Sequence, residues 1–119
     1  MKYALMIHSE RDHDRTLSPE ETAELRAKSM PRWLALFEHL ETLDPEVAGV
    51  ELDSPALTKT VRVRDGKPIV TDGPFVETKE QIGGVFLISL PNLDAAIDAA
   101  ARIPTAEHGT VEIRPLVER

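Results

Sequence analysis

The sequence has no cysteine in its 119 residues, and this absence excludes disulfides, thiol nucleophiles and cysteine-ligated zinc sites. Basic residues are also in deficit, because 14 Lys and Arg stand against 21 Asp and Glu and give a net charge of −7. A protein that follows the backbone of DNA or RNA needs a basic surface, so we expect no nucleic-acid partner.

Long hydrophobic runs are missing as well. No apolar stretch reaches the length of a membrane span, and the amino-terminal stretch "MKYALMIHSERD" becomes charged directly after Ile7, too early for a signal peptide. We therefore expect a cytoplasmic protein with no membrane contact. The sequence is long enough for one core and contains no linker or repeat, so residues 1–119 are predicted to form a single domain.

A long first helix is predicted from its capping residues. Ser18 as N-cap, Pro19 at the first helical position and Glu21 as the capping-box partner start a helix that runs to about Leu43. Pro31 is expected to kink or break it near residues 27–31. Its apolar stripe is predicted to consist of Met30, Trp33, Leu34, Phe37 and Leu40.

The remaining elements follow from apolar patterning and turn residues. Asn92 is expected to cap a second helix, which Pro104 ends. Asp65-Gly66 predicts a tight hairpin turn between two short strands, because glycine tolerates the positive φ of such turns. The hairpin strands are expected at residues 58–64 and 68–71, and the other strands at residues 2–8, 46–52, 84–90 and 110–117.

The order of these elements is β-α-β, an inserted hairpin and β-α-β. This order predicts an α+β fold, a ferredoxin-like sandwich with both helices on one face of the sheet. Residues 3–7 and 85–88 are nevertheless apolar at consecutive positions, which suits burial on both faces. We predict that a second copy of the sheet covers the other face in a homodimer, whereas the alternative is a monomer with a partly apolar exposed sheet.

The stretch "TDGPF" between two apolar runs is the most conspicuous candidate site. Asp72 has two interpretations: a general base or ligand-binding carboxylate at a strand end, or a turn residue that accepts backbone N–H bonds. Gly73 is expected to supply a backbone angle that a side chain would prevent. Phe75 is interpreted as a plug in the core or the dimer, with substrate stacking as the alternative.

The polar residues around this stretch are the other candidates. Glu77 and Lys79 are two residues apart, so an extended segment would point both toward a polar substrate; a solvated, salt-bridged loop is the alternative. His8 falls at a strand end where a ferredoxin-like cleft would open. The histidines and carboxylates of residues 8–14 match no metal motif, so no metal site is predicted. No glycine-rich loop has phosphate-binding spacing, so no organic cofactor is predicted.

Residues 61–88, "VRVRDGKPIVTDGPFVETKEQIGGVFLI", resemble the DGPF proteins of the YCII-related family, and the resemblance extends to "MKYALMIH", "LSPEE" and "VEIRPL". It implies a ferredoxin-like protomer that pairs as a dimeric α/β barrel. The family has no generally assigned reaction, although its members look like small enzymes and some occur beside extracytoplasmic-function sigma factors. Shorter YCII-type relatives have a first-helix histidine proposed to act with an aspartate; Trp33 stands near that position here, so only the DGPF region is carried over.

We therefore expect a small-molecule-binding homodimer with a cleft near Asp72, contacted by His8 and Trp33. As an enzyme it would use Asp72 for acid–base chemistry on a small polar or aromatic metabolite, with Glu77 and Lys79 holding the substrate. The alternative is a non-enzymatic ligand sensor or protein-interaction dimer linked to sigma-factor regulation. That alternative predicts binding without turnover.

Overall fold

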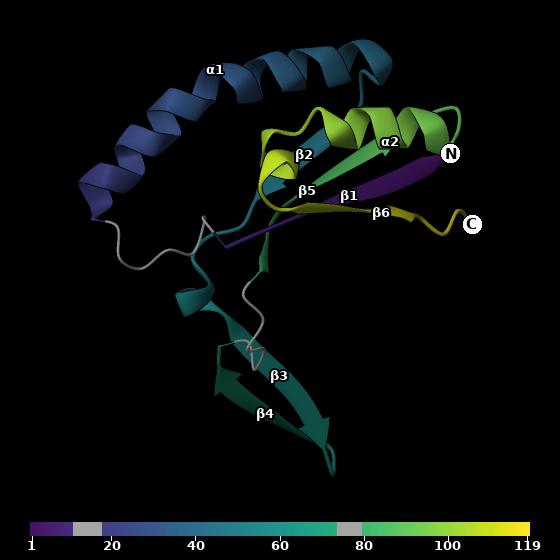
Figure 1. The fold of residues 1–119 in the computed structure, drawn as a ribbon. Coiled ribbons are helices and arrows are strands. Elements are labelled where there is room, and N and C mark those ends of the chain that lie inside the picture. Colours follow the sequence, from purple (N-terminus) through teal and green to yellow (C-terminus); the bar gives the residue numbers. More distant parts are fainter. Residues whose placement is uncertain (11–17, 74–79) are drawn as a thin grey trace.

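The computed structural model of the protein describes residues 1–10, 18–73 and 80–119. Every predicted strand and helix is present in these residues (Figure 1). Their order is β1 (Lys2–Ser9), α1 (Pro19–Leu43), β2 (Ala48–Glu51), the 3-10 helix η2 (Pro55–Leu57), β3 (Lys59–Arg64), β4 (Lys67–Asp72), β5 (Gln81–Ser89), α2 (Leu93–Ala101), the 3-10 helix η3 (Pro104–Glu107) and β6 (Thr110–Pro115).

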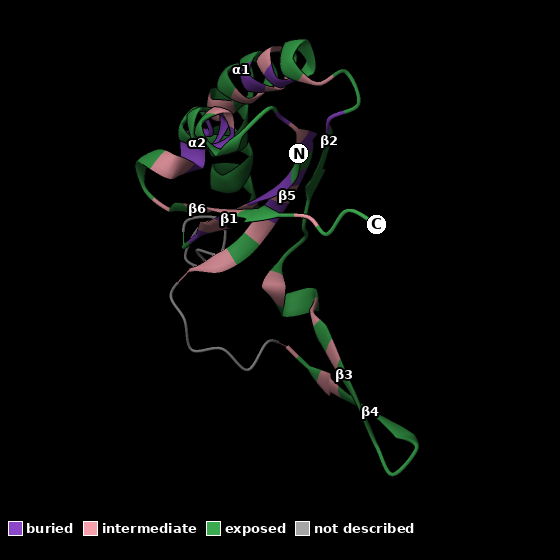
Figure 2. Ribbon diagram, turned by 90° about the vertical axis from the view of Figure 1, so that its right-hand side faces the viewer, coloured by how far each residue is buried: buried purple, intermediate pink, exposed green. Residues whose placement is uncertain are grey.

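The main sheet has the strand order β2-β5-β1-β6, and all neighbouring strands are antiparallel. Both α-helices lie on one side of this sheet (Figure 1). The architecture is α+β and compatible with the predicted ferredoxin-like sandwich. Strands β3 and β4 form a separate two-stranded sheet that projects away on the side opposite the helices (Figures 1 and 2).

Helix α1 begins with a side-chain cap. The Ser18 Oγ accepts a hydrogen bond from the Glu21 N–H at 3.1 Å, and the Glu21 carboxylate accepts one from the Ser18 N–H at 3.2 Å, which is the predicted capping box. The helix is continuous through Pro31 and bends along its length (Figure 1), so the predicted break does not occur.

The end of α1 is fixed to the sheet by Asp44. Its carboxylate accepts hydrogen bonds from the Ser89 N–H at 2.8 Å and the Glu46 N–H at 3.0 Å. These bonds favour the charged form and hold the pKa of Asp44 below its usual value, the bond from Ser89 having the larger effect. The first position after the helix is therefore tied to β5.

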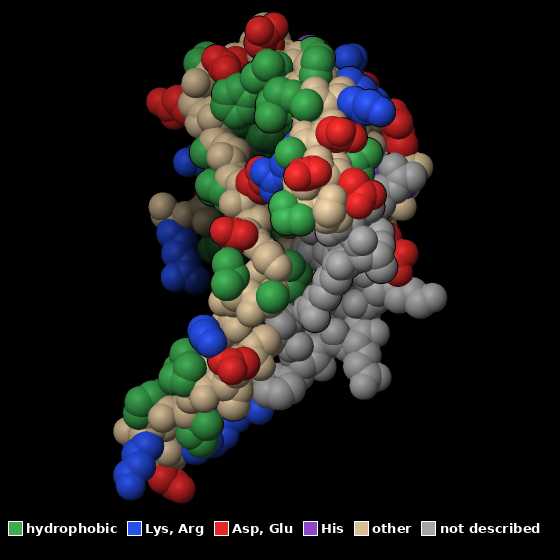
Figure 3. All heavy atoms as spheres, turned by 90° about the vertical axis from the view of Figure 1, so that its left-hand side faces the viewer, with side chains coloured by type: hydrophobic (Ala, Val, Ile, Leu, Met, Phe, Trp, Pro, Cys, Tyr) green, Lys and Arg blue, Asp and Glu red, His purple; other side chains and the backbone are tan. Residues whose placement is uncertain are grey.

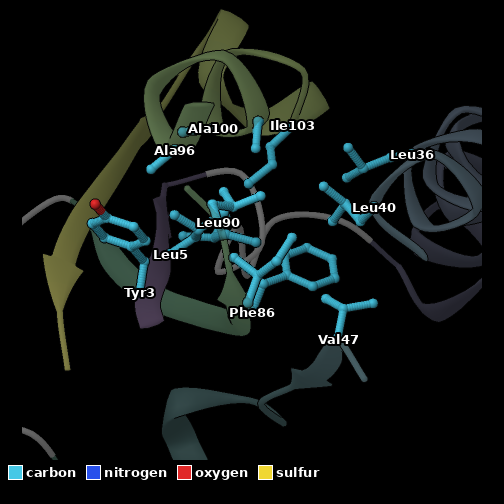
Figure 4. Close-up of a cluster of buried hydrophobic side chains, with 13 residues drawn as sticks. Tyr3, Leu5, Leu36, Leu40, Val47, Phe86, Leu90, Ala96, Ala100 and Ile103 are labelled. Carbon is cyan, nitrogen blue, oxygen red and sulfur yellow. The ribbon is translucent and has the colours of Figure 1, made fainter. Parts of the chain in front are cut away.

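The core lies between the helices and the sheet (Figure 4). Helix α1 buries Leu36 and Leu40, while Trp33 and Phe37 are half-buried beside them. The predicted stripe was partly wrong, because Met30 and Leu34 are exposed. Only the second half of α1 packs on the sheet. Leu36 and Leu40 belong to one buried cluster, whose other members include Tyr3, Leu5, Ile7, Val47, Phe86 and Leu90.

The overall shape is more extended than that of a compact domain of this size. The Cα radius of gyration is 16.4 Å, whereas a compact domain of this length has about 13.5 Å. Two parts account for the difference: none of residues 19–32 in α1 is buried, and the β3–β4 hairpin is exposed over most of its length (Figure 2). In a compact domain, both parts would be packed against neighbouring elements.

Candidate functional site

The sheet face opposite the helices carries a row of apolar side chains. Side chains alternate between faces along a strand, so the residues between the core positions of β1 and β5 point to this open face. The pairing register places Val50, Val85 and Met6 side by side on β2, β5 and β1, and Glu112 of β6 ends the row. Leu87 lies in the neighbouring row and is 44% exposed.

A polar group stands at the end of this face, where β1 meets β6. The His8 Nε2 atom lies 3.4 Å from the Glu112 Oε1 atom, and the second oxygen of that carboxylate accepts a hydrogen bond from Arg114 at 2.5 Å. His8 Nε2 is shielded from solvent and has no hydrogen-bond partner. The structure therefore presents a histidine, a carboxylate and a guanidinium together beside an apolar surface.

Two irregularities of the backbone position His8. The β1–β5 register shifts between Ile7 and His8, so His8 is opposite Ile82 instead of Gly83. Such a bulge re-aims a side chain at a strand end. Gly109 leads into β6, and there is no room for a side chain at this position. A Cβ there would lie 2.4 Å from the His8 carbonyl oxygen. The close approach of these two backbones requires glycine and fixes how His8 meets β6.

The chemistry of this group is that of proton transfer. An imidazole beside a carboxylate can take up or give up a proton near neutral pH, and the carboxylate orients the ring. Arg114 places a positive charge on the other side of Glu112. His39 on α1 also has a shielded Nε2 atom without a hydrogen bond, but no ion pair is recorded for it in the described part of the chain.

Asp72 lies at the base of the hairpin, away from the sheet. Its side chain is 86% exposed and forms an ion pair with Lys59. Backbone groups close the turn: the Gly73 N–H donates to the Thr58 carbonyl and the Thr60 hydroxyl donates to the Gly73 carbonyl, both at 2.7 Å. Gly73 has φ +81°, which confirms the backbone angle predicted for it.

The other predicted site residues are not gathered around Asp72 in the described residues of a single copy. Trp33 packs against the core on the helix side of the sheet, whereas His8 points to the open face. Phe75, Glu77 and Lys79 lie outside the described residues. The predicted cleft formed by Asp72, His8 and Trp33 remains a prediction, and a single copy of the chain does not assemble it.

Glu112 and Arg114 were missed by sequence reasoning. A signal was available, because the strand "TVEIRP" alternates Val111 and Ile113 with Glu112 and Arg114. The two apolar residues pack on the core, so the charged pair must share the opposite face.

Within residues 1–10, 18–73 and 80–119, no three His, Asp or Glu side chains gather as a metal site. None of the helices in those ranges is long and apolar enough to cross a bilayer.

Comparison with known proteins places the chain in a family. A model of the YCII-related domain matches residues 1–119. The chain belongs to the YCII-related family. The YCII-related chain is also 48% identical over 59 residues to an uncharacterized protein of Rhizobium meliloti (strain 1021). This match covers 48% of each protein, so the chain spans about half the length of the curated relative that it matches. Neither description names a ligand or a reaction, so a function for this YCII-related domain has to be argued from its residues.

Proposed function

We propose that this YCII-related protein is a homodimer that binds a small molecule between two sheets. In the dimer, the open faces of two copies pack against each other as a dimeric α/β barrel. The apolar row of Val50, Val85 and Met6, together with Leu87, supports this arrangement, because monomers rarely leave such a face uncovered. The extended shape of a single copy supports it too.

The observation that carries the binding site is the His8 Nε2 atom, which is shielded from solvent and lies 3.4 Å from the Glu112 Oε1 atom without a hydrogen bond. A shielded nitrogen without a hydrogen bond is costly unless a ligand supplies the partner. In the dimer this nitrogen faces an interior lined mainly by aliphatic side chains. The site therefore suits a small, largely apolar metabolite that carries one hydrogen-bonding group.

The reaction that fits these groups is acid–base chemistry without an organic cofactor. His8 transfers the proton, Glu112 orients the imidazole, and Arg114 holds Glu112 in place. Asp72, the carboxylate predicted from the sequence, would join this chemistry only if a second copy brought it to the sheet. We keep Asp72 as a separate prediction with its own test.

A screen of small metabolites by thermal shift tests the site. A ligand at about 100 times its dissociation constant adds about 2.7 kcal/mol to the free energy of unfolding, which raises the midpoint by roughly 10 °C for a chain of this size. The shift should disappear in His8→Gln and persist in the matched control His108→Gln, whose imidazole lies exposed in a loop. An equal shift in both variants would place the ligand elsewhere.

The second candidate function is a ligand-sensing or protein-interaction dimer that catalyses nothing. The exposed apolar hairpin favours it, because an enzyme of this size has no catalytic need for a projecting surface. Proton NMR of the identified ligand, followed over hours with the protein present, separates the two candidates. Conversion of the ligand that His8→Gln abolishes supports the enzyme, and binding without conversion supports the sensor.

A further inference from the structure

The β3–β4 hairpin is built entirely by local contacts. Asp65 and Gly66 have φ of 52° and 72°, as a two-residue hairpin turn requires, and the ladder pairs every residue from Lys59–Asp72 to Arg64–Lys67. It belongs to a sheet of its own. A lone two-stranded hairpin is only marginally stable in water, so a hairpin this regular indicates that another surface covers it.

The two faces of the hairpin differ in chemistry. One face carries Val61 and Val63 with Val70 and Pro68 opposite them, and each of the three valines is 60% or 61% exposed. The other face is mainly polar and basic. It consists of Thr60, Arg62, Arg64, Lys67, Ile69 and Thr71. Alternation of this kind is typical of a ribbon that is covered on one side.

The hairpin also differs in charge from the rest of the chain. Residues 59–72 contain four Lys and Arg and two Asp, a formal charge of +2, so the remaining residues contain ten Lys and Arg and nineteen Asp and Glu, a charge of −9. Figure 3 shows hydrophobic and basic side chains together over the projecting hairpin. A basic, apolar ribbon on an acidic chain is complementary to a second copy of that chain.

The first half of α1 offers the matching surface. Residues 19–32 are not buried, and they expose Leu25 and Met30. Residues 19–32 contain three Glu and three Lys or Arg. Two of these bases, Arg26 and Arg32, are paired with Glu51 and Glu107 outside the segment. An open hollow lies next to this segment. It is lined by Arg26, Glu51, Leu52 and Asp53.

The hairpin cannot reach this surface in its own copy, because it projects on the side of the sheet away from the helices (Figures 1 and 2). A second copy is within reach. Strands of six residues extend roughly 20 Å, whereas two packed sheets are roughly 10 Å apart, so the hairpin can pass the second sheet and meet its helix layer. The end of α1 nearest Pro19 extends beyond the sheet (Figure 1), which leaves it open to such an approach.

We propose that the β3–β4 hairpin is an exchange arm, which lays its face of Val61, Val63 and Val70 on the first half of α1 in the second copy. Two-fold symmetry makes the exchange reciprocal, so both arms and both helix halves are covered at once. The arm rests on the proposed homodimer and adds to it a contact that the sheets do not make.

Paramagnetic relaxation enhancement between copies tests the arm. The absence of cysteine allows a nitroxide to be attached solely at Lys67→Cys near the hairpin tip. This spin-labelled chain is mixed with an equal amount of nitrogen-15-labelled wild-type chain. Amides of residues 19–30 in the isotope-labelled copy should lose up to about half of their intensity, because random pairing joins half of the isotope-labelled copies to a spin-labelled copy. A label at Asp94→Cys, which is exposed on α2, is the matched control and should leave those amides unchanged.

A double variant keeps the test independent of the label. Val61→Thr with Val70→Thr preserves strand propensity and removes apolar surface from the arm. It should weaken the dimer at least tenfold and abolish the broadening, while the circular dichroism of the rest of the chain is unchanged.

The outcomes separate the arm from the proposed sheet pairing. A dimer without broadening of residues 19–30 overturns the arm and leaves the homodimer intact. Broadening that survives Leu87→Glu on the sheet face supports the arm and overturns the sheet pairing. A monomer at all concentrations overturns both. The arm is also overturned if the amides of the hairpin are protected from hydrogen exchange only when a nucleic acid or another protein is added.

Discussion

Leu87→Glu is the sharpest perturbation of the open sheet face. Complete burial of a leucine side chain contributes about 1.5–3 kcal/mol. Leu87 is still 44% exposed in a single copy, so covering the remainder in a dimer contributes about 0.7–1.3 kcal/mol. Two-fold symmetry doubles this contribution to about 1.3–2.6 kcal/mol per dimer.

Glutamate at this position removes that contribution and adds a second cost. Each dimer would bury two carboxylates opposite an apolar sheet, and removal of an unpaired charge from water costs several kcal/mol. A total of at least about 4 kcal/mol is expected, which raises the dimer dissociation constant about 1,000-fold.

Sedimentation equilibrium measures the effect directly. Wild type should have twice the chain mass of 13.2 kDa at micromolar concentration, and Leu87→Glu should have the mass of one chain. The matched control is Ile97→Glu, because Ile97 is 49% exposed but lies on α2 on the helix side of the sheet. Control and wild type should dimerise equally. The reasoning is refuted if Leu87→Glu dimerises as wild type does, or if Ile97→Glu dissociates to the same extent.

Three further variants test the fold and the site. Asp44→Asn should lower the melting temperature at pH 7. Because the folded pKa of Asp44 is depressed, its carboxylate stabilises the fold above the unfolded pKa of 3.8, and this stabilisation is lost as the pH falls through the lower folded pKa. A difference in melting temperature between wild type and Asp44→Asn that is undiminished near pH 2 would contradict this reasoning. Gly109→Ala should cost about 1–3 kcal/mol in urea unfolding, since its methyl group would meet the His8 carbonyl oxygen; unchanged stability would contradict that contact. Asp72→Asn should change the free energy of unfolding by less than about 1 kcal/mol, because its ion pair with Lys59 is exposed. If Asp72→Asn leaves the turnover of an identified ligand unchanged, Asp72 is not the catalytic carboxylate.

Features set by neighbours in the sequence were predictable. The capping box at Ser18 and the Asp65-Gly66 turn each depend on two to four consecutive residues, and both are present as predicted. The buried side of α1 was predicted less well, because Met30 and Leu34 were assigned to the apolar stripe and are exposed, whereas Leu36 was not assigned to it and is buried. Which of them is buried depends on how far the sheet extends under the helix, and Met30 lies beyond it. Periodicity defines a helix face and leaves its covered length open.

The pairing of His8 with Glu112 could not be predicted in the same way. The two residues lie at opposite ends of the sequence and meet only because β6 pairs with β1. The ferredoxin-like order does imply this pairing, but the register and the bulge at His8 decide which side chains become neighbours. Those details arise from the assembled sheet, including the space that Gly109 leaves.

Asp72 has two possible places in the dimer. The sequence motif suggests a carboxylate in a site, whereas its exposure in a single copy suggests a carboxylate that serves only the hairpin. A carboxylate that serves only its hairpin has no reason to face anything beyond Lys59. If the hairpin docks on a second copy, however, the base of the arm moves with it and Asp72 becomes part of an interface. The burial of Asp72 would then depend on dimerisation. Carbon-13 NMR of the Asp72 carboxylate with a soluble paramagnetic agent, in wild type and in the monomeric Leu87→Glu variant, measures this dependence. Weaker paramagnetic broadening in wild type would connect the DGPF stretch to the assembled dimer, and equal broadening would confine Asp72 to its turn.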